Sequence, residues 1–244
     1  MPPTLYVIRH GQGEHNVNDA SHLRDPLLTA KGKEQCLELQ QAFPVPQDIS
    51  LILASPLQRT IQTAAYAFAP ELDARNVSFI LTPNAQEISG MNCDIGHKVD
   101  FIRETAPRLI HEAAPSWKVE NLDTTLVKED WNSKKGIYAP TLTSVRRRAA
   151  ELRKWIWSRP EKDIVLVTHG GFLHYLTEDW TGYVVERGTG YQNCEYRKLE
   201  FTPESNAEEA HLVEPGSSRE KQGRAAGLDA HVVREIEEVE NAIE

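Results

Sequence analysis

The sequence of 244 residues has only three cysteines, and this scarcity limits both the compartment and the kinds of site that it can support. Cys36, Cys93 and Cys194 lie far apart and are odd in number, so they cannot form a disulfide framework or a zinc ribbon. The sequence also lacks any run of about 18 apolar residues, which a membrane-spanning helix requires. These absences argue against a secreted disulfide scaffold and a membrane protein, and they predict a cytoplasmic location without excluding the nucleus.

The sequence also has fewer basic than acidic residues. The 27 lysines and arginines are outnumbered by 36 acidic residues, for a net charge of −9, and ten acidic but only four basic residues follow position 204. A negative protein is a poor partner for nucleic acid or an anionic membrane, so neither is expected here. The first ten residues have neither the basic segment nor the apolar segment of a signal peptide, and we expect them to begin a strand.

The pattern of apolar residues predicts the fold. Four short apolar runs, 4–8, 50–54, 77–81 and 164–168, read as strands buried on both faces. Between them lie predicted helices: one from the Thr29 cap to Pro44, one opened by Ser55-Pro56 and ending near Phe68, and an amphipathic one over 142–156. Residues 197–201 alternate charged and apolar side chains, which predicts a last, antiparallel edge strand. This alternation predicts a three-layer α/β/α fold with a mostly parallel central sheet.

Two parts of the chain are expected. Residues 1–204 form one α/β domain, in which residues 97–140 make an insertion of helix and loop because Pro107 and Pro115 interrupt the helical pattern. Residues 205–244 are predicted to be a polar linker followed by an acidic amphipathic helix, whose apolar positions are Val232, Ile236, Val239 and Ile243. This terminal helix can dock on its own domain or contact a partner, and the oligomeric state is not predicted.

Two of the predicted strands end in the same residues. His10-Gly11 follows the first strand and His169-Gly170 follows the strand over 164–168. Ligands of open α/β sheets bind at the carboxyl ends of the strands, so neighbouring strands would bring both imidazoles to one crevice. Arg9, Asn16 and Arg59 also follow strand ends, and guanidinium groups suit phosphate oxygens. The sequence therefore predicts a phosphate site.

Several segments, taken together and in order, resemble the histidine phosphatase superfamily, also called the phosphoglycerate mutase-like family. They are 5–16 (LYVIRHGQGEHN), 28–32 (LTAKG), 55–64 (SPLQRTIQTA), 86–88 (QEI) and 167–171 (VTHGG). The resemblance spans roughly residues 4 to 201, and the conjunction is more specific than any single motif. It implies the phosphoglycerate mutase-like fold and, on the phosphatase branch, hydrolysis of a small phosphorylated substrate.

The resemblance also implies a role for each matching residue. His10 is the nucleophile that takes the phosphoryl group, and Glu87 is the general acid for the leaving oxygen and then the base for water. Arg9, Arg59 and His169 complete the catalytic set by stabilising charge on the transferring group. The residues implied to bind the phosphate are Arg9, Asn16, Arg59, His169 and Gly170. The resemblance implies neither a metal nor an organic cofactor.

Two other functions stay open at this level. A phosphoglycerate-type mutase would use the same phosphohistidine but return the phosphoryl group to a second hydroxyl. The segment after Glu87 does not resemble that of the mutases, which favours hydrolysis. The fold could instead serve as a scaffold or interaction subunit through its acidic tail, although a complete set of catalytic residues argues against a dead enzyme.

The remaining candidates are assigned structural roles. His15 and Glu14 are expected on a surface loop, because their spacing from His10 is not that of a metal-binding helix. The run 146–148 (RRR) is expected on a solvated helix face. His174 is expected to be an ordinary helix residue, and nothing in the sequence marks Cys93 as reactive.

Overall fold

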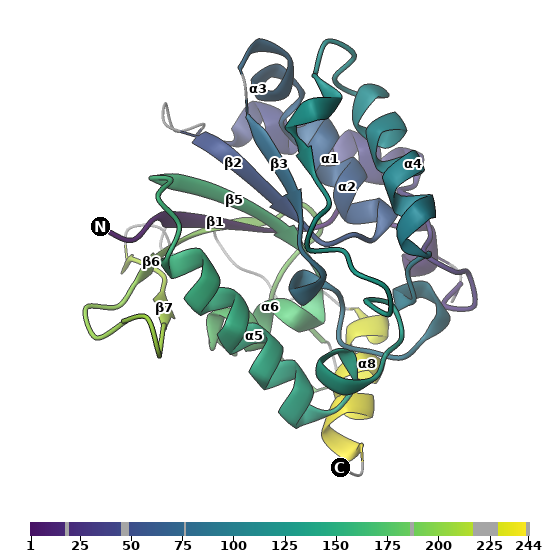
Figure 1. Cartoon of the computed structure of the whole chain (residues 1–244). Coiled ribbons are helices and arrows are strands. Elements are labelled where there is room, and N and C mark those ends of the chain that lie inside the picture. The colour runs from purple at the N-terminus through teal and green to yellow at the C-terminus, as the bar shows by residue number, and fades with distance from the viewer. Residues whose placement is uncertain (18–19, 45–48, 76, 186–187, 217–228, 243–244) are drawn as a thin grey trace.

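The apolar runs predicted as buried strands form the middle of one sheet. The computed structural model describes residues 1–17, 20–44, 49–75, 77–185, 188–216 and 229–242. Within them, seven strands are ordered β4-β3-β2-β5-β1-β6-β7 (Figure 1). The strands are β1 (Thr4–Arg9), β2 (Ile49–Ala54), β3 (Ser78–Leu81), β4 (Leu122–Asp123), β5 (Asp163–Thr168), β6 (Tyr196–Phe201) and β7 (Leu212–Val213). Strands β1 to β5 pair in parallel, β6 runs antiparallel to β1, and β7 runs antiparallel to β6.

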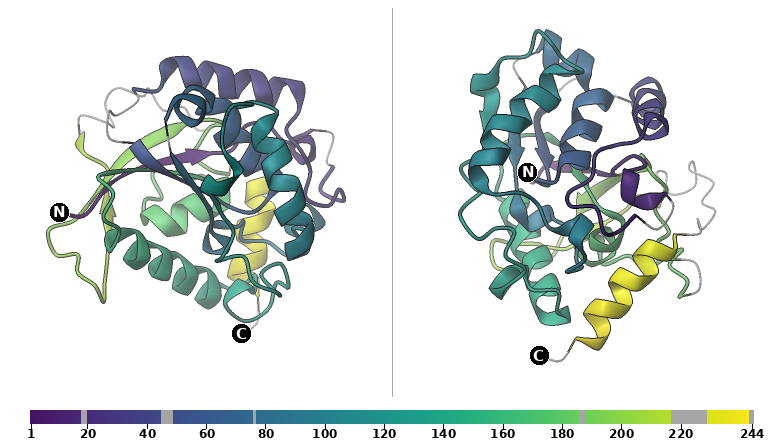
Figure 2. Two further views of the ribbon diagram at one scale, coloured as in Figure 1. Left: turned by 45° about the horizontal axis from the view of Figure 1, so that its top comes forward. Right: turned by 90° about the vertical axis from the view of Figure 1, so that its right-hand side faces the viewer.

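Helices cover both faces of this sheet, as Figures 1 and 2 show. One face carries α1 (Ala30–Ala42), α2 (Gln58–Ala67), α3 (Ala69–Ala74) and α4 (Val99–His111). The other carries α5 (Leu142–Trp157), α6 (Gly170–Thr177) and α8 (Ala230–Asn241). Short 3-10 turns lie at η1 (Glu14–Asn16), η2 (Pro83–Ala85), η3 (Asn92–Asp94), η4 (Val119–Asn121) and η5 (Gly136–Tyr138). The predicted three-layer α/β/α fold with a mostly parallel sheet is confirmed.

Three local predictions are corrected. The helix after β2 begins at Gln58 and not at Ser55-Pro56, because the Ser55 hydroxyl is engaged with His169, 3.0 Å away. The 97–140 region is more than an insertion, since its strand β4 extends the sheet beside β3 and Pro107 lies inside α4. Strand β6 is antiparallel as predicted but is not the edge, because β7 pairs with its outer side.

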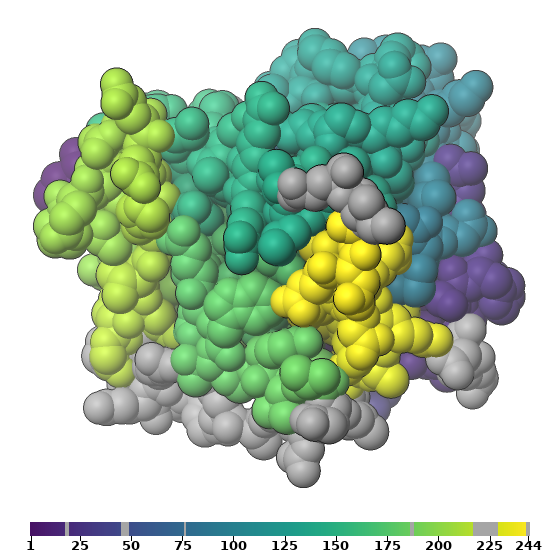
Figure 3. Space-filling view, turned by 90° about the horizontal axis from the view of Figure 1, so that it is seen from below, coloured from purple at the N-terminus to yellow at the C-terminus, as the bar shows by residue number. Residues whose placement is uncertain are grey.

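The terminal helix α8 lies on the same body as the sheet. Its apolar side chains Val232, Ile236 and Val239 are buried in the cluster formed with α5, α6 and one face of the sheet. Figure 3 shows α8 seated against α6 on the underside of the molecule. A further contact joins its Glu238 carboxylate to the backbone N–H of Gly90, at 3.0 Å. The helix was expected to dock on its own domain or to contact a partner, and the structure shows it docked on its own domain. The fourth predicted apolar position, Ile243, lies outside the described residues.

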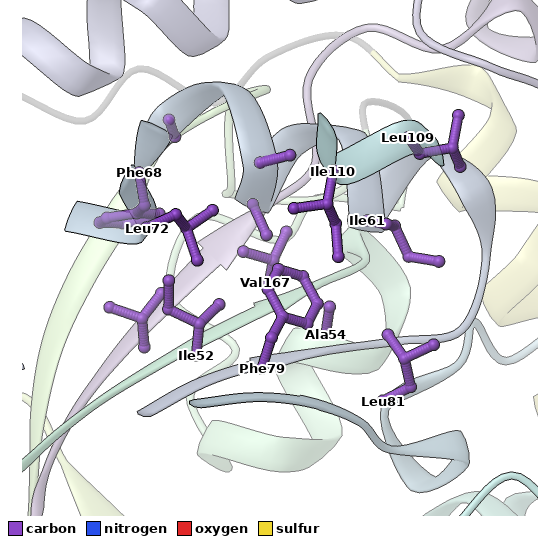
Figure 4. Packing of buried hydrophobic residues seen from close by; sticks show 14 of the residues in the cluster. Ile52, Ala54, Ile61, Phe68, Leu72, Phe79, Leu81, Leu109, Ile110 and Val167 are labelled. Carbon is purple, nitrogen blue, oxygen red and sulfur yellow. The ribbon is translucent and has the colours of Figure 1, made fainter. Parts of the chain in front are cut away.

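The strands alternate their side chains between two apolar cores, as the period of two requires. In β1, Leu5 and Val7 enter the core under α5 and α6, while Tyr6 and Ile8 enter the core under α1 to α4. Figure 4 shows the latter core, with Ile61 of α2 and Ile110 of α4 above the sheet. With both faces covered, the carboxyl ends of β1, β2 and β5 are the places where functional side chains can gather. Among the described helices, none has the length and apolar character needed to cross a bilayer.

Candidate active site

The two strand-end histidines lie side by side. Because β1 and β5 pair in parallel with Arg9 opposite Thr168, His10 and His169 follow neighbouring strands at the same level. Their ring centroids are 5.1 Å apart, with an interplanar angle of 65°. His10 is 2% exposed and His169 is fully buried. The register of two adjacent strands thus brings together residues that are far apart in the sequence.

Hydrogen bonds set the tautomer of His10. Its Nδ1 lies 2.7 Å from the carbonyl oxygen of Gly11, which can only accept, so Nδ1 carries the proton. Its Nε2 then holds a lone pair and accepts from Nε of Arg59, at 3.3 Å. Burial and the charges of Arg59 and Arg9 hold the pKa of His10 well below its usual value. The imidazole is therefore neutral, with the lone pair that a nucleophile needs.

Arg59, in the first turn of α2, links the groups of the site. Besides His10, its guanidinium reaches the carbonyl of Cys93 at 2.8 Å, Asp94 Oδ1 at 2.7 Å and His169 Nδ1 at 3.2 Å. His169 accepts this bond on Nδ1, and its Nε2–H donates to Ser55. Burial would raise the pKa of Asp94, but the charge of Arg59, together with Lys134, His231 and the Ser89 hydrogen bond, lowers this pKa. Arg59 and Asp94 are thus a fully buried ion pair beside the two histidines.

Arg9, at the end of β1, is held from two sides. One guanidinium nitrogen donates to the carbonyl of Tyr191 at 2.8 Å, and the other forms an ion pair with Asp229, just before α8. Burial would raise the pKa of Asp229, but the charge and hydrogen bond of Arg9, with smaller contributions from His231 and the Val232 N–H, lower it. Its Nε has no partner among the described residues. In this structure the Asp229 carboxylate therefore pairs with the Arg9 guanidinium, which the resemblance assigns to phosphate binding.

Glu87 follows β3 and η2 and points to the start of α6. Its Oε1 accepts from the backbone N–H groups of Ile88 and Phe172, at 3.0 and 2.9 Å, and its Oε2 accepts from Gly171 at 3.2 Å. These bonds and the charge of Arg59 favour the ionised form, but burial and the nearby Asp94 raise the pKa of Glu87. Burial and Asp94 together outweigh these interactions, so the pKa of Glu87 lies above the ordinary value for a glutamate.

The comparison with known families fits this arrangement of two histidines, two arginines and a buried glutamate. Residues 5–212 match the model of the histidine phosphatase superfamily, branch 1. The chain belongs to this superfamily.

Individual relatives agree with this assignment. A phosphoglycerate mutase-like protein of Arabidopsis thaliana is 29% identical over 235 residues, which cover 83% of this chain and 86% of that protein. A probable phosphatase of Schizosaccharomyces pombe is 28% identical over 172 residues, covering 68% and 74%. The ecdysone phosphate phosphatase of Bombyx mori, solved with tungstate, aligns with a TM-score of 0.56 at 16% identity and covers 87% and 92%. At that identity, the structural likeness supports the fold alone.

Two residues were placed wrongly from the sequence. His15 is buried and not on a surface loop, with its ring centroid 5.6 Å from that of His10 and 5.0 Å from that of His231. Arg148 is buried and not solvated, because its guanidinium donates to the carbonyls of Asn84, Gln86 and Glu87. Both are drawn inward by partners distant in sequence, and Arg148 anchors the segment that carries Glu87.

The other predicted site residues lie near the same strand ends. The Asn16 Oδ1 accepts from the backbone N–H of Gly13 at 3.0 Å, which leaves its Nδ2 buried and unpaired within the described part of the chain. Gly170 opens α6, and a β-carbon there would come within 2.9 Å of Arg9 Nε. Only a glycine therefore lets α6 begin so close to the Arg9 guanidinium. His174 is held by Asp179 and Thr189 as an ordinary buried helix residue, in agreement with the prediction.

Cys93, Asp94 and His231 place three ligand-type atoms within 4.8 Å of one another. Both oxygens of Asp94 already accept hydrogen bonds, from Arg59 and, at 2.5 Å, from Ser89. Burial also raises the pKa of the Cys93 thiol, and a thiol must ionise to bind a metal. A cluster that holds a guanidinium cation and a protonated thiol does not fit a divalent ion, so we derive no step through a metal.

The sequence did not point to the groups that α8 contributes. Half-buried Asp229 lies beside Arg9, and buried His231 and Glu235 lie beside Cys93 and Gly171, although all three lie outside the resemblance. The available signal was that His231 and Glu235 immediately precede Val232 and Ile236 on the apolar face of the helix. Polar residues at the border of an apolar stripe are common, so the signal alone is weak.

Proposed function

We propose that this protein is a phosphomonoesterase that hydrolyses a small phosphorylated substrate through a phosphohistidine on His10. The observation that carries the proposal is the neutral His10 imidazole, whose Nε2 lone pair lies beside the Arg59 guanidinium and His169. A fixed lone pair next to permanent positive charge is suited to attack on a phosphoryl group. One relative is named a probable phosphatase, which supports the same proposal.

In the first step the Nε2 lone pair forms a bond to phosphorus while the bond from phosphorus to the leaving oxygen breaks. Arg59 and the unpaired Nδ2 of Asn16 donate to the phosphoryl oxygens, and His169 does so by exchanging its bond to Ser55 for phosphate. Arg9 joins them by exchanging the Asp229 carboxylate for phosphate. The leaving oxygen takes its proton from Glu87, whose raised pKa suits that role.

In the second step water attacks the phosphohistidine. The Glu87 carboxylate accepts a proton from the water, the bond from nitrogen to phosphorus breaks, and orthophosphate leaves with His10 restored. No charge needs to be supplied by a metal, because two guanidinium groups surround the phosphoryl group. Three free, buried thiols suit a reducing compartment, and we place the enzyme in the cytoplasm.

A time course of product formation tests this proposal against the mutase alternative. A panel of phosphorylated metabolites, sugar phosphates and phosphoglycerates is incubated with the protein, and orthophosphate and isomerised product are measured together. We expect orthophosphate in step with loss of substrate, and acid-labile, base-stable phosphate on the quenched protein. Isomerisation without orthophosphate would establish the mutase instead.

Glu87→Gln separates the acid role from binding. Because glutamine cannot donate a proton to the leaving oxygen, we expect kcat/KM for alkyl phosphates to fall by about 10²–10⁴. Nitrophenyl phosphate should lose far less, because nitrophenolate leaves without a proton. The exposed Glu120→Gln is the matched control and should change neither substrate. Equal losses on both substrates would show that Glu87 is not the acid.

A further inference from the structure

The C-terminal helix buries an ionisable pair that its packing does not require. His231 and Glu235 are four residues apart on α8, 5% and 1% exposed, with Nε2 of His231 2.9 Å from Oε1 of Glu235. Val232, Ile236 and Val239 already supply the apolar contacts that dock the helix. Burying a carboxyl costs free energy unless partners compensate it. A glutamate at this position therefore calls for a role other than packing.

The carboxyl oxygen of Glu235 that has no hydrogen-bond partner among the described residues lies on the side of α8 that faces Glu87. This oxygen is Oε2. A β-carbon built on Gly171 would lie 3.1 Å from this oxygen and 2.9 Å from Oε1 of Glu87. The two carboxyls thus approach one point at the start of α6, where only a glycine leaves room for both.

The surroundings do not allow both carboxyls to ionise freely. Burial, and then the negative charge of Glu87 and Asp94, raises the pKa of Glu235 well above its usual value. Two buried carboxyls that lie close together do not both ionise readily, so such a pair keeps a proton to higher pH than an isolated glutamate does. The other ionisable groups around the pair are Cys93 and Asp94 after β3, Asp229 before α8, His231 on α8, Arg59 on α2, Tyr175 on α6, Arg148 on α5 and Lys134 before η5.

We propose that Glu235 is a positioning residue that shares one acid–base proton with Glu87 in the resting enzyme. The inference rests on the proposed function. Three backbone N–H donors favour the ionised form of Glu87, so the proton resides on the free Oε2 of Glu235 before substrate binds. The negative charge of an arriving phosphoryl group draws this proton to Glu87. Its transfer to the leaving oxygen leaves two carboxylates, whose repulsion makes Glu87 a stronger base for the attacking water.

The pH profile of Glu235→Gln tests this role. Glutamine keeps the size of the side chain and a bond to His231 but cannot ionise. Once the second carboxyl is replaced, Glu87 no longer shares a proton and loses its own at lower pH, so the alkaline limb of kcat/KM for 2-glycerophosphate should shift down by about one pH unit or more. The exposed Glu237→Gln, on the same helix, should keep the wild-type limb. An unchanged limb in Glu235→Gln would overturn the proposal.

A second measurement needs no turnover. In protein labelled with ¹³C at the glutamate carboxyls, the resonances of Glu87 and Glu235 are assigned with Glu87→Gln and Glu235→Gln and followed against pH. We expect one of them to titrate well above the ordinary glutamate range, and each variant to lower the midpoint of the remaining partner. Two independent midpoints, each insensitive to the other replacement, would refute the shared proton.

The two measurements separate this inference from the proposed function. Coupled titration in a protein that forms no phosphohistidine and releases no orthophosphate would leave the shared proton standing and remove the phosphatase. Phosphohistidine formation with independent titration of Glu87 and Glu235 would remove the shared proton alone.

Discussion

Replacing His10 by alanine is expected to reduce hydrolysis of phosphate monoesters by about 10⁵–10⁶, the range seen when an enzyme loses its nucleophile. The other groups that hold phosphate stay in place, but no lone pair remains at Nε2 to form the bond to phosphorus. The rate of nitrophenyl phosphate hydrolysis should fall as much as the rate for alkyl phosphates, because the bond to phosphorus cannot form whatever the leaving group is. Initial rates on both substrates measure the effect.

The covalent intermediate gives a second measure of the same variant. Wild-type protein mixed with ³²P-labelled substrate and quenched in alkali should carry label that acid releases, whereas His10→Ala should carry none. The exposed His22→Ala is the matched control and should be labelled like the wild type. Activity of His10→Ala within a hundredfold of the wild type would refute the assignment of the nucleophile.

Arg59→Met is expected to damage both turnover and stability. The guanidinium is fully buried and contacts His10, Asp94 and His169 and the Cys93 carbonyl, so its loss removes the charge beside the phosphoryl group. Losing one such donor costs about 10²–10³ in kcat. Asp94 is also left buried without its cation, which typically destabilises a fold by about 3–5 kcal/mol. Denaturant unfolding and steady-state kinetics measure the two effects.

The double variant Arg59→Met with Asp94→Asn separates the two effects. Because asparagine carries no charge, most of the lost stability should return, while turnover stays low since nothing replaces the guanidinium. The exposed pair of Arg103 with Asp100 on α4 supplies the control, and Arg103→Met should cost less than about 1 kcal/mol. Recovery of turnover in the double variant would show that Arg59 acts only through stability.

Local patterns were sufficient for much of the fold. The apolar run of β1 and the Thr29 cap predict elements that the structure contains, and Thr29 Oγ1 accepts from the backbone N–H of Gly32 as a cap should. The predicted start of α2 was wrong because the Ser55 hydroxyl hydrogen-bonds with His169, which lies 114 residues away along the chain. A capping signal is read from neighbours along the chain, and such a distant partner does not appear in it.

The residues of the site also fall into those that local motifs identify and those whose positions depend on distant partners. His10, Arg59, Glu87 and His169 stand in motifs that their own neighbours define, so the sequence identified them as a set. His15 was missed because its burial depends on the ring of His231, which a different element brings from the end of the chain. Arg148 was missed because its three carbonyl partners lie at least 61 residues away.

The sequence by itself determined the strands at the centre of the sheet, several of the helices, the family, and the residues that follow β1, β2, β3 and β5. Only the tertiary structure decided which charges face them. Asp229 pairs with Arg9 across 220 residues, and Glu235 approaches Glu87 only because α8 docks its apolar side chains beside α6. Propensity and apolar period act over a few residues, whereas desolvation and Coulomb energy depend on distance in space. The protonation of this site is therefore a property of the folded chain.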